Sequence, residues 1–230
     1  METPSPSPAS PPIKPPPWSP PRPLPSPLRT ERLSIRFFEP GDADSMFAAI
    51  DADRASLLPW LPWAATDNRN VSECLFHIER FRRTREGTGA ADFALGLFDA
   101  GTGEVVGGIG FHRIDAEIAQ GEIGYWIRGD QARRGLCTEA VAALIAAALT
   151  PQREGGWGFR RVTIVCAEPN VASRRVPEKL GLPLELSTRG DRWLDGLGFT
   201  GTLSWGVLRE EWDFEAKRSR PRAAFGGAGR

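Results

Sequence analysis

The stretch from Gly121 to Leu149, GEIGYWIRGDQARRGLCTEAVAALIAAAL, constrains the fold more than any other part of the chain. Its first residues predict a β-strand that runs to Ile127 and ends at the turn formers Gly129 and Asp130. The run AVAALIAAAL then holds ten helix formers without Gly, Pro or charge, which predicts a helix buried nearly all round. Such a run is too short to span a bilayer. The chain is therefore expected to build its domain around a central strand-turn-helix unit.

The turn of this unit suits a phosphate-rich ligand. The first backbone N–H groups of a helix have no partner inside the helix, and the helix dipole adds about half a positive charge there. Arg133 and Arg134 place fixed positive charge beside those donors. A pyrophosphate fits such a site. A strand, a turn with two exposed arginines and a core helix also occur in α/β domains of many functions, so the turn alone leaves both interpretations open.

Composition divides the chain into three parts. Residues 1–28 hold 13 of the 21 prolines and are predicted to be a disordered or polyproline II tail, with no signal peptide. Residues 214–230 are predicted to be a basic flexible tail. The remaining residues, 29–213, are long enough for one domain of ordinary size.

Charge and cysteine content limit the partners. Residues 31–216 hold 28 acidic against 21 basic side chains, which argues against nucleic acid and favours a cationic acceptor such as an amine. Cys74, Cys137 and Cys166 are odd in number and far apart, so we expect reduced thiols in a cytoplasmic protein that does not bind membranes. With only two histidines, we expect no metal site.

The remaining patterns predict an α+β fold, with a mixed, mostly antiparallel sheet of about seven strands flanked by helices. Strands are expected over residues 29–38, 91–98, 104–114, 117–127, 160–167, 183–187 and 200–209. Helices are expected over residues 43–53, after a capping box at 70–73, in the central unit, and over 170–180. The segment Leu57–Trp63 holds two prolines and two tryptophans, which predicts an aromatic-lined loop. A second loop is expected over 189–196.

Five ordered stretches resemble a known superfamily. Residues Ala132 to Cys137 (ARRGLC) resemble the acetyl-CoA signature of the GNAT superfamily of N-acetyltransferases, Gln/Arg-x-x-Gly-x-Gly/Ala, and depart from it at the first and last positions. Four further stretches are similar to the ribosomal-protein (RimJ/RimL-like) N-acetyltransferases of that superfamily: Thr30–Leu33, Leu61–Trp63, Asn170–Gly181 and Arg189–Trp212. Together the stretches cover about residues 29 to 213.

The resemblance implies a GNAT fold, with a V-shaped splay between the central strand and the strand at 160–167, and acetyl-CoA as the co-substrate in that splay. A primary amine, either a protein N-terminal α-amine or a small-molecule amine, would attack the thioester directly. Ala132, Cys137 and Pro177 motivate an alternative, a non-catalytic acyl-CoA-binding or regulatory module. A third hypothesis is a scaffold whose proline-rich tail recruits partners. A monomer and a homodimer are both compatible with the sequence.

The resemblance also implies cofactor contacts. The matching positions are Trp126, Ile127, Arg133, Arg134, Gly135, Leu136, Cys137, Thr138, Asn170 and Ser173. A backbone N–H at Trp126 or Ile127 would hold the oxyanion. Asn170 and Ser173 would meet the pantetheine arm and the sulfur, and they also serve as a helix cap and a small residue of the first turn. Pro177 replaces the tyrosine that protonates the thiolate in many GNAT enzymes, which leaves Ser173, water or no donor and predicts a kinked helix.

The acceptor side depends on a few side chains. Glu122 is the first candidate for the general base, because strand parity places it on the face of Trp126, although it could also be a solvent-exposed strand glutamate. Glu139 is the rival, but an acid in a first helical turn usually complements the dipole. His112, Trp60 and Trp63 are candidate acceptor-site residues. The alternatives are a hydrogen-bonded histidine and core tryptophans.

Overall fold

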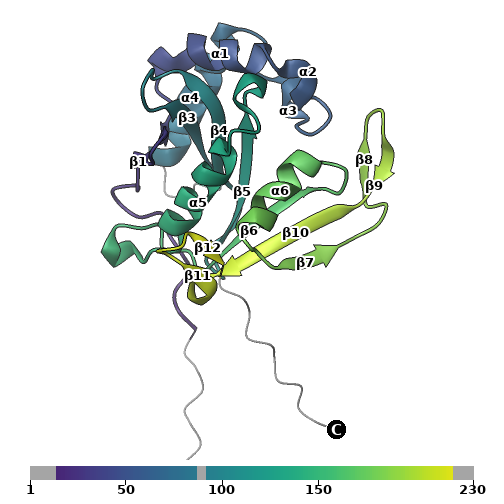
Figure 1. Cartoon of the computed structure of the whole chain (residues 1–230). Helices are drawn as coiled ribbons and strands as arrows, with labels where there is room; N and C mark the ends of the chain where they lie inside the picture. The colour runs from purple at the N-terminus through teal and green to yellow at the C-terminus, as the bar shows by residue number, and fades with distance from the viewer. Residues whose placement is uncertain (1–13, 87–91, 220–230) are drawn as a thin grey trace, which may run out of the picture.

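The computed structural model describes residues 14–86 and 92–219. The central unit consists of the strand β5 (Gln120–Ile127), the 3-10 turn η2 (Gly129–Gln131) and the helix α5 (Leu136–Leu149). Figure 1 shows the strand and the helix. The strand and the helix confirm the prediction for this stretch. The helix begins before its run of small apolar residues, because Gly135 forms the N-cap and Leu136 is already buried.

The main sheet has eight strands in the order β1-β2-β3-β4-β5-β6-β10-β7. The bounds of the other seven are β1 (Leu28–Arg29), β2 (Leu33–Phe37), β3 (Phe93–Asp99), β4 (Val105–Asp115), β6 (Arg161–Ala167), β7 (Leu184–Ser187) and β10 (Thr202–Leu208). All neighbours are antiparallel except β5 and β6, which are parallel. The sheet is therefore mixed and mostly antiparallel, as predicted, with the two-residue β1 as an additional edge strand.

Helices cover both faces of the sheet (Figure 1). Their bounds are α1 (Ala43–Asp51), α2 (Arg54–Leu57), α3 (Trp63–Thr66), α4 (Val71–Glu86) and α6 (Val171–Lys179). The larger core joins α5 to the sheet and contains Ile123 and Ile145, whereas a second core joins α1 to α4 and contains Met46 and Ile78. Trp126 packs against this second core. Side chains of β5 therefore alternate between an α5/α6 face and an α1/α4 face.

Two segments that were expected to be loops contain short regular elements. Within Leu57–Trp63, α2 ends at Leu57 and Pro62 is the N-cap of α3. After β7, a hairpin forms between β8 (Arg192–Leu194) and β9 (Gly198–Thr200). Each of these elements is three or four residues long. Elements of that length are too short for a periodic pattern to show in the sequence.

The proline-rich segment differs from the expected tail where the structure describes it. In residues 14–28, the Trp18 ring stacks on Phe159 with centroids 4.6 Å apart, and its Nε1 donates to the Trp157 carbonyl at 2.8 Å. A proline-rich chain has little conformational freedom to lose, so a few apolar anchors are enough to dock it. Residues 1–13 lie outside the described part of the chain.

The C-terminal end also extends beyond the expected domain boundary. A small two-stranded sheet pairs β11 (Trp212–Asp213) with β12 (Arg218–Ser219), so part of the expected basic tail folds back on the domain. The rest of that tail, residues 220–230, is outside the described range. Two further 3-10 turns are η1 (Pro40–Asp42) and η3 (Gln152–Glu154), and a third, η4 (Arg209–Glu211), precedes β11. Across residues 14–86 and 92–219, no helix is long and apolar enough to cross a membrane.

Candidate active site

The two parallel strands of the main sheet separate shortly after they meet. β5 pairs with β6 only where Gln120 to Glu122 lie beside Arg161 to Thr163, although β5 continues to Ile127. Figure 1 shows the result as a V, with β5 as one arm and β6 with β10 as the other. This geometry confirms the predicted splay between the central strands.

The start of α5 forms the turn at the side of this V. Gly135 adopts the left-handed conformation, with φ of 82°, and Arg133 also has a positive φ of 60°. Because Gly135 has no side chain, it offers no capping oxygen to the first turn of α5. The N–H groups of Leu136, Cys137 and Thr138 are too close to the start of α5 to donate to a carbonyl within the helix. They therefore remain available as donors for a ligand. An anion is the ligand that such a helix terminus favours.

Polar contacts brace the turn from the outside. The Arg134 side chain donates to Gln131 Oε1, and its carbonyl accepts from Arg32 Nη1 at 2.9 Å. Glu139, in the first turn of α5, accepts from Thr30 Oγ1 at 2.5 Å and from Arg32 Nε at 2.7 Å. Burial acts to raise the pKa of Glu139, but the hydrogen bonds from Thr30 and Arg32 outweigh it and lower the pKa overall. Glu139 is therefore a structural ion-pair partner at this turn.

The first turn of α6 borders the V beside β6. Asn170 caps the helix by accepting from the Ser173 N–H at 3.1 Å. The helix runs through Pro177, which has no N–H to donate to the Ser173 carbonyl one turn earlier. The Tyr125 hydroxyl, reaching over from β5, donates to that carbonyl at 2.9 Å. Tyr125 thus replaces the helical hydrogen bond that the proline removes, and α6 continues past the residue that predicted a kink.

The tyrosine hydroxyl and the two thiols beside the first turn of α6 are uncharged at neutral pH. Burial raises the pKa of Tyr125 far above its ordinary value, although the hydrogen bond with Ser173 opposes the shift. Burial also raises the pKa of the Cys137 thiol to about 12 and increases that of Cys166. The Ser173 hydroxyl lies 3.3 Å from the Tyr125 oxygen, so a chain of neutral donors connects β5 to α6.

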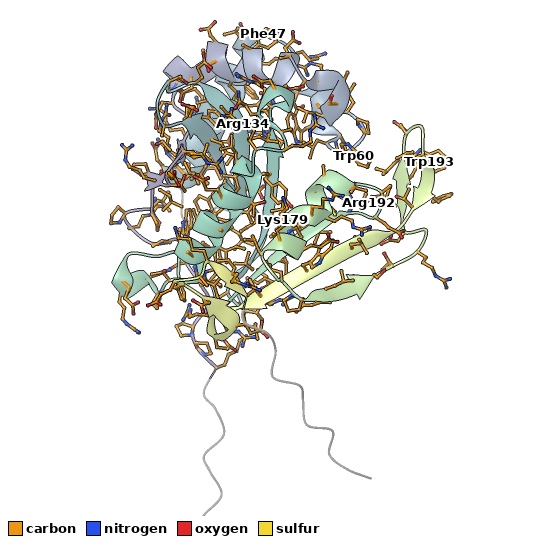
Figure 2. The ribbon with its side chains drawn as sticks, in the orientation of Figure 1. Phe47, Trp60, Arg134, Lys179, Arg192 and Trp193 are labelled. Carbon is orange, nitrogen blue, oxygen red and sulfur yellow. The ribbon has the colours of Figure 1, made fainter. Side chains whose placement is uncertain are left out.

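The α1/α4 face of β5 carries the candidate acceptor residues. Trp126 makes an edge contact with Trp63, the first residue of α3, with ring centroids 6.2 Å apart. Trp60 is half-buried in the turn before α3. Figure 2 shows Trp60 and Trp193, the latter on β8, at the same open end of the V. Trp193 is 60% exposed and contacts Phe199 across the hairpin.

Two pairs of ionisable side chains lie near the point where β5 leaves β6. Both oxygens of Glu122 accept from Arg113 Nη1, at 3.1 and 2.9 Å. His112 is the cross-strand partner of Glu122 on β4, and its Nδ1 lies 3.3 Å from Asp92 Oδ1. The predicted residues Glu122 and His112 are therefore neighbours, on the face opposite to Tyr125.

Sequence reasoning missed three residues of this region. Asp92 and Arg113 are brought into this region by strand pairing and by a bulge in β4, and the sequence reveals neither. Tyr125 had a signal, because it is the only tyrosine in a chain with 12 phenylalanines and 8 tryptophans. A single hydroxyl among so many apolar rings indicates a position that needs a donor. Among the residues that the structure describes, no group of three or more His, Cys, Asp or Glu could hold a metal ion.

Comparison with known families decides what this architecture is. The acetyltransferase (GNAT) domain family matches residues 32–183, which is well over half of the 230 residues. The chain belongs to the GNAT family. It is accordingly an acyltransferase of the N-acetyltransferase type.

Individual relatives agree with this assignment. YdaF of Bacillus subtilis (strain 168), named provisionally as a ribosomal N-acetyltransferase, is 29% identical over 185 residues, covering 80% of this chain and 96% of its own. A solved structure of RimL, a ribosomal L7/L12 alpha-N-protein acetyltransferase in complex with coenzyme A, has a TM-score of 0.68 at 19% identity and covers 78% of this chain and 95% of its own. The ribosomal-protein-S5-alanine acetyltransferase of Vibrio fischeri has a TM-score of 0.69 at 16% identity, with coverage of 80% and 97%. The two structures support the fold alone.

Proposed function

We propose that this protein transfers the acetyl group of acetyl-CoA to a primary amine, and that a protein N-terminal α-amine is its first candidate acceptor. The observation that carries the proposal is the separation of β5 from β6 beside the uncapped start of α5. The relative YdaF, whose name points to ribosomal N-acetylation, supports the choice of acceptor class. A small-molecule amine is the other acceptor that we would test.

The residues around the turn fit a pyrophosphate. The N–H groups of Leu136, Cys137 and Thr138 supply donors, and Arg133 and Arg134 supply exposed positive charge. Because backbone groups would provide most of the contacts, we expect the site to tolerate the absence of the signature side chain at position 132. The pantetheine arm would then follow the V past Asn170 and Ser173, at the start of α6.

Sheet register favours one of the two oxyanion donors. The Arg128 N–H donates to the Val106 carbonyl, so the alternating pattern of antiparallel strands turns the backbone groups of Trp126 toward β4. The groups of Tyr125 and Ile127 then face the β6 side, where β5 has no pairing partner beyond Glu122. We therefore assign the oxyanion to the Ile127 N–H. A donor of this kind is worth about 2.7 to 4 kcal/mol.

The leaving thiolate needs a proton, and Ser173 is our candidate donor. Its hydroxyl is at the start of α6 and is hydrogen-bonded to the half-buried Tyr125 hydroxyl, which remains neutral. The acceptor would approach from the α1/α4 face, where Trp60, Trp63 and Trp126 offer aromatic surface to a cationic amine. We assign the activity to residues 29–213, and the three free cysteines favour a cytoplasmic location.

The experiment incubates the full chain with acetyl-CoA and a panel of acceptors, and it follows the release of free CoA thiol. The panel contains peptides that begin with Ala or Ser, an otherwise identical N-acetylated peptide as the matched control, and small amines. Amine-dependent release above the hydrolysis background is the expected result. If acetyl-CoA neither binds in calorimetry nor turns over with any acceptor, the proposal fails.

A further inference from the structure

Four residues form a row across the sheet at the apex of the V. On β3, β4 and β5, Phe93, Phe111 and Ile123 are cross-strand partners and point into the α5 core. The neighbouring residues in the chain, Asp92 and His112, therefore lie on the opposite face. His112 pairs with Glu122, and Glu122 pairs with Thr163 on β6 in the last pair before the strands separate.

The imidazole of His112 is held in a defined orientation. Its Nδ1 lies 3.3 Å from Asp92 Oδ1, so this nitrogen faces the carboxylate and Nε2 lies at the other edge of the ring. The other edge of the ring lies over Gly124 on β5. A Cβ atom at Gly124 would stand 2.8 Å from His112 Cδ2 and 3.1 Å from Nε2. Nε2 is therefore directed at β5, just past the apex of the V.

The ring is accessible from solvent. The side chain of His112 is 46% exposed, and that of Asp92 is 50% exposed. The α1/α4 face thus leaves room for a ligand to reach Nε2. Trp126 lies farther along β5, toward the open end of the V. The turn that holds Trp60 also lies at that end.

Glu122, by contrast, already has a partner. Both of its oxygens accept from the guanidinium of Arg113, whose backbone adopts a left-handed conformation with φ of 47° within the irregular pairing that follows His112. A carboxylate held in this way has both oxygens engaged by a cation. The neighbouring histidine has one nitrogen engaged and the other available.

We infer that His112 is the proton acceptor for the incoming amine and that Asp92 is the residue that positions it, an inference that rests on the proposed acetyl transfer. An acceptor R–NH₃⁺ gives one proton to Nε2 and becomes R–NH₂. The amine nitrogen forms a bond to the thioester carbon, and the C–S bond breaks as the C=O bond re-forms. The Ser173 hydroxyl gives its proton to the CoA thiolate and is reprotonated by the second nitrogen proton, and the imidazolium returns the first proton to solvent.

The test compares variants of the full chain with the Ala- and Ser-initiated peptides and acetyl-CoA. His112→Ala is expected to lower kcat on the order of a hundredfold to ten-thousandfold, as for other general bases, with the KM for acetyl-CoA unchanged. Added imidazole should restore part of the lost rate, which a purely structural role would not allow. Asp92→Asn should lower kcat by less, again without a change in that KM.

Two further variants keep the test decisive if His112→Ala is poorly folded. Gly124→Ala adds only one methyl group but displaces the imidazole, so it should lower kcat while acetyl-CoA still protects the protein against heat. Arg113→Gln frees Glu122, and its kcat should stay close to that of the wild type. An increase in kcat for Arg113→Gln, or a wild-type kcat for His112→Ala together with inactive Glu122→Gln, overturns the inference in favour of Glu122.

These outcomes separate the inference from the proposed function. If the wild type releases CoA with an amine and His112→Ala does so equally well, acetyl transfer stands and the role of His112 falls. If the wild type releases no CoA with any acceptor, both proposals fall together.

Discussion

The two faces of β5 are built in different ways. On the α5/α6 face, the turn at Gly135 and the cap at Asn170 present backbone groups, and the half-buried Tyr125 serves mainly to complete the backbone of α6. On the α1/α4 face, the available groups are side chains, with His112 and Glu122 each held by a charged neighbour. A site made of backbone depends on conformation, whereas a site made of side chains depends on residue identity.

Because of this difference, we expect a departure from the family signature to be tolerated on one face. Cys137 replaces a small residue in the turn, yet its N–H is still one of the first-turn donors. A substitution on the other face removes the functional group itself, because no backbone group can replace an imidazole. We therefore expect cofactor affinity to follow the conformation of the turn, and turnover to follow the residues of the α1/α4 face.

The largest effect on cofactor binding should come from Gly135→Val. A β-branched residue at a φ of 82° introduces strain of about 1 to 3 kcal/mol. We expect acetyl-CoA to bind at least about tenfold more weakly in calorimetry. Ala132→Gln restores the signature side chain without changing the backbone and serves as the control, with an affinity close to that of the wild type. A strong gain from Ala132→Gln with no loss from Gly135→Val would reverse the account of this face.

A smaller effect is expected for Tyr125→Phe, which removes the donor to the Ser173 carbonyl. An unsatisfied buried carbonyl should lower the free energy of unfolding by about 1 to 2 kcal/mol in urea denaturation. Pro177→Ala restores a backbone N–H at the helical position, so Tyr125→Phe should cost much less in that background. Equal costs in both backgrounds would show that the tyrosine does not complete the helix.

Removing the exposed charge at the turn should have a modest effect. Arg133→Ala and Arg134→Ala are each expected to weaken acetyl-CoA binding by less than about 1 kcal/mol, because solvent and salt screen exposed charges. The loss should shrink further as ionic strength rises in the calorimeter. Arg153→Ala, an arginine with an 82% exposed side chain on another turn, is the matched control and should leave binding unchanged. A salt-independent loss would indicate a structural role for these arginines instead.

The smallest effect concerns Glu139 and pH. Its folded-state pKa is lowered below the ordinary value of 4.5, so its contribution to stability is complete above pH 4.5 and is lost as the pH falls below that value. Thermal unfolding should therefore separate the wild type from Glu139→Gln at pH 7, and the difference should diminish toward pH 3. A difference that grows on acidification contradicts the assignment of Glu139 as an ion-pair partner of Arg32.

Local patterns in the sequence predicted much of the fold and little of the acceptor face. The central unit and the helix at Asn170 carry strong periodic or capping signals, so both could be placed before the structure was known. The contact of Trp18 with Phe159 and that of Tyr125 with Ser173 join residues far apart in the chain, which no local pattern reveals.

The same limit applies to the candidate base. Strand parity correctly placed Glu122 on the face of Trp126, but the ion pair with Arg113 depends on a bulge, and the His112–Asp92 contact depends on the register of two strands. The hairpin that holds Trp193 was missed because its strands are only three residues long.

The most direct test of the division between the two faces is the rate of CoA release by the wild type and by His112→Ala, at saturating acetyl-CoA, with a peptide that begins with Ala or Ser. The account predicts amine-dependent release by the wild type, and release near the hydrolysis background by the variant, although both bind acetyl-CoA equally. Equal rates for the two proteins, or a variant that loses acetyl-CoA binding together with turnover, would contradict it.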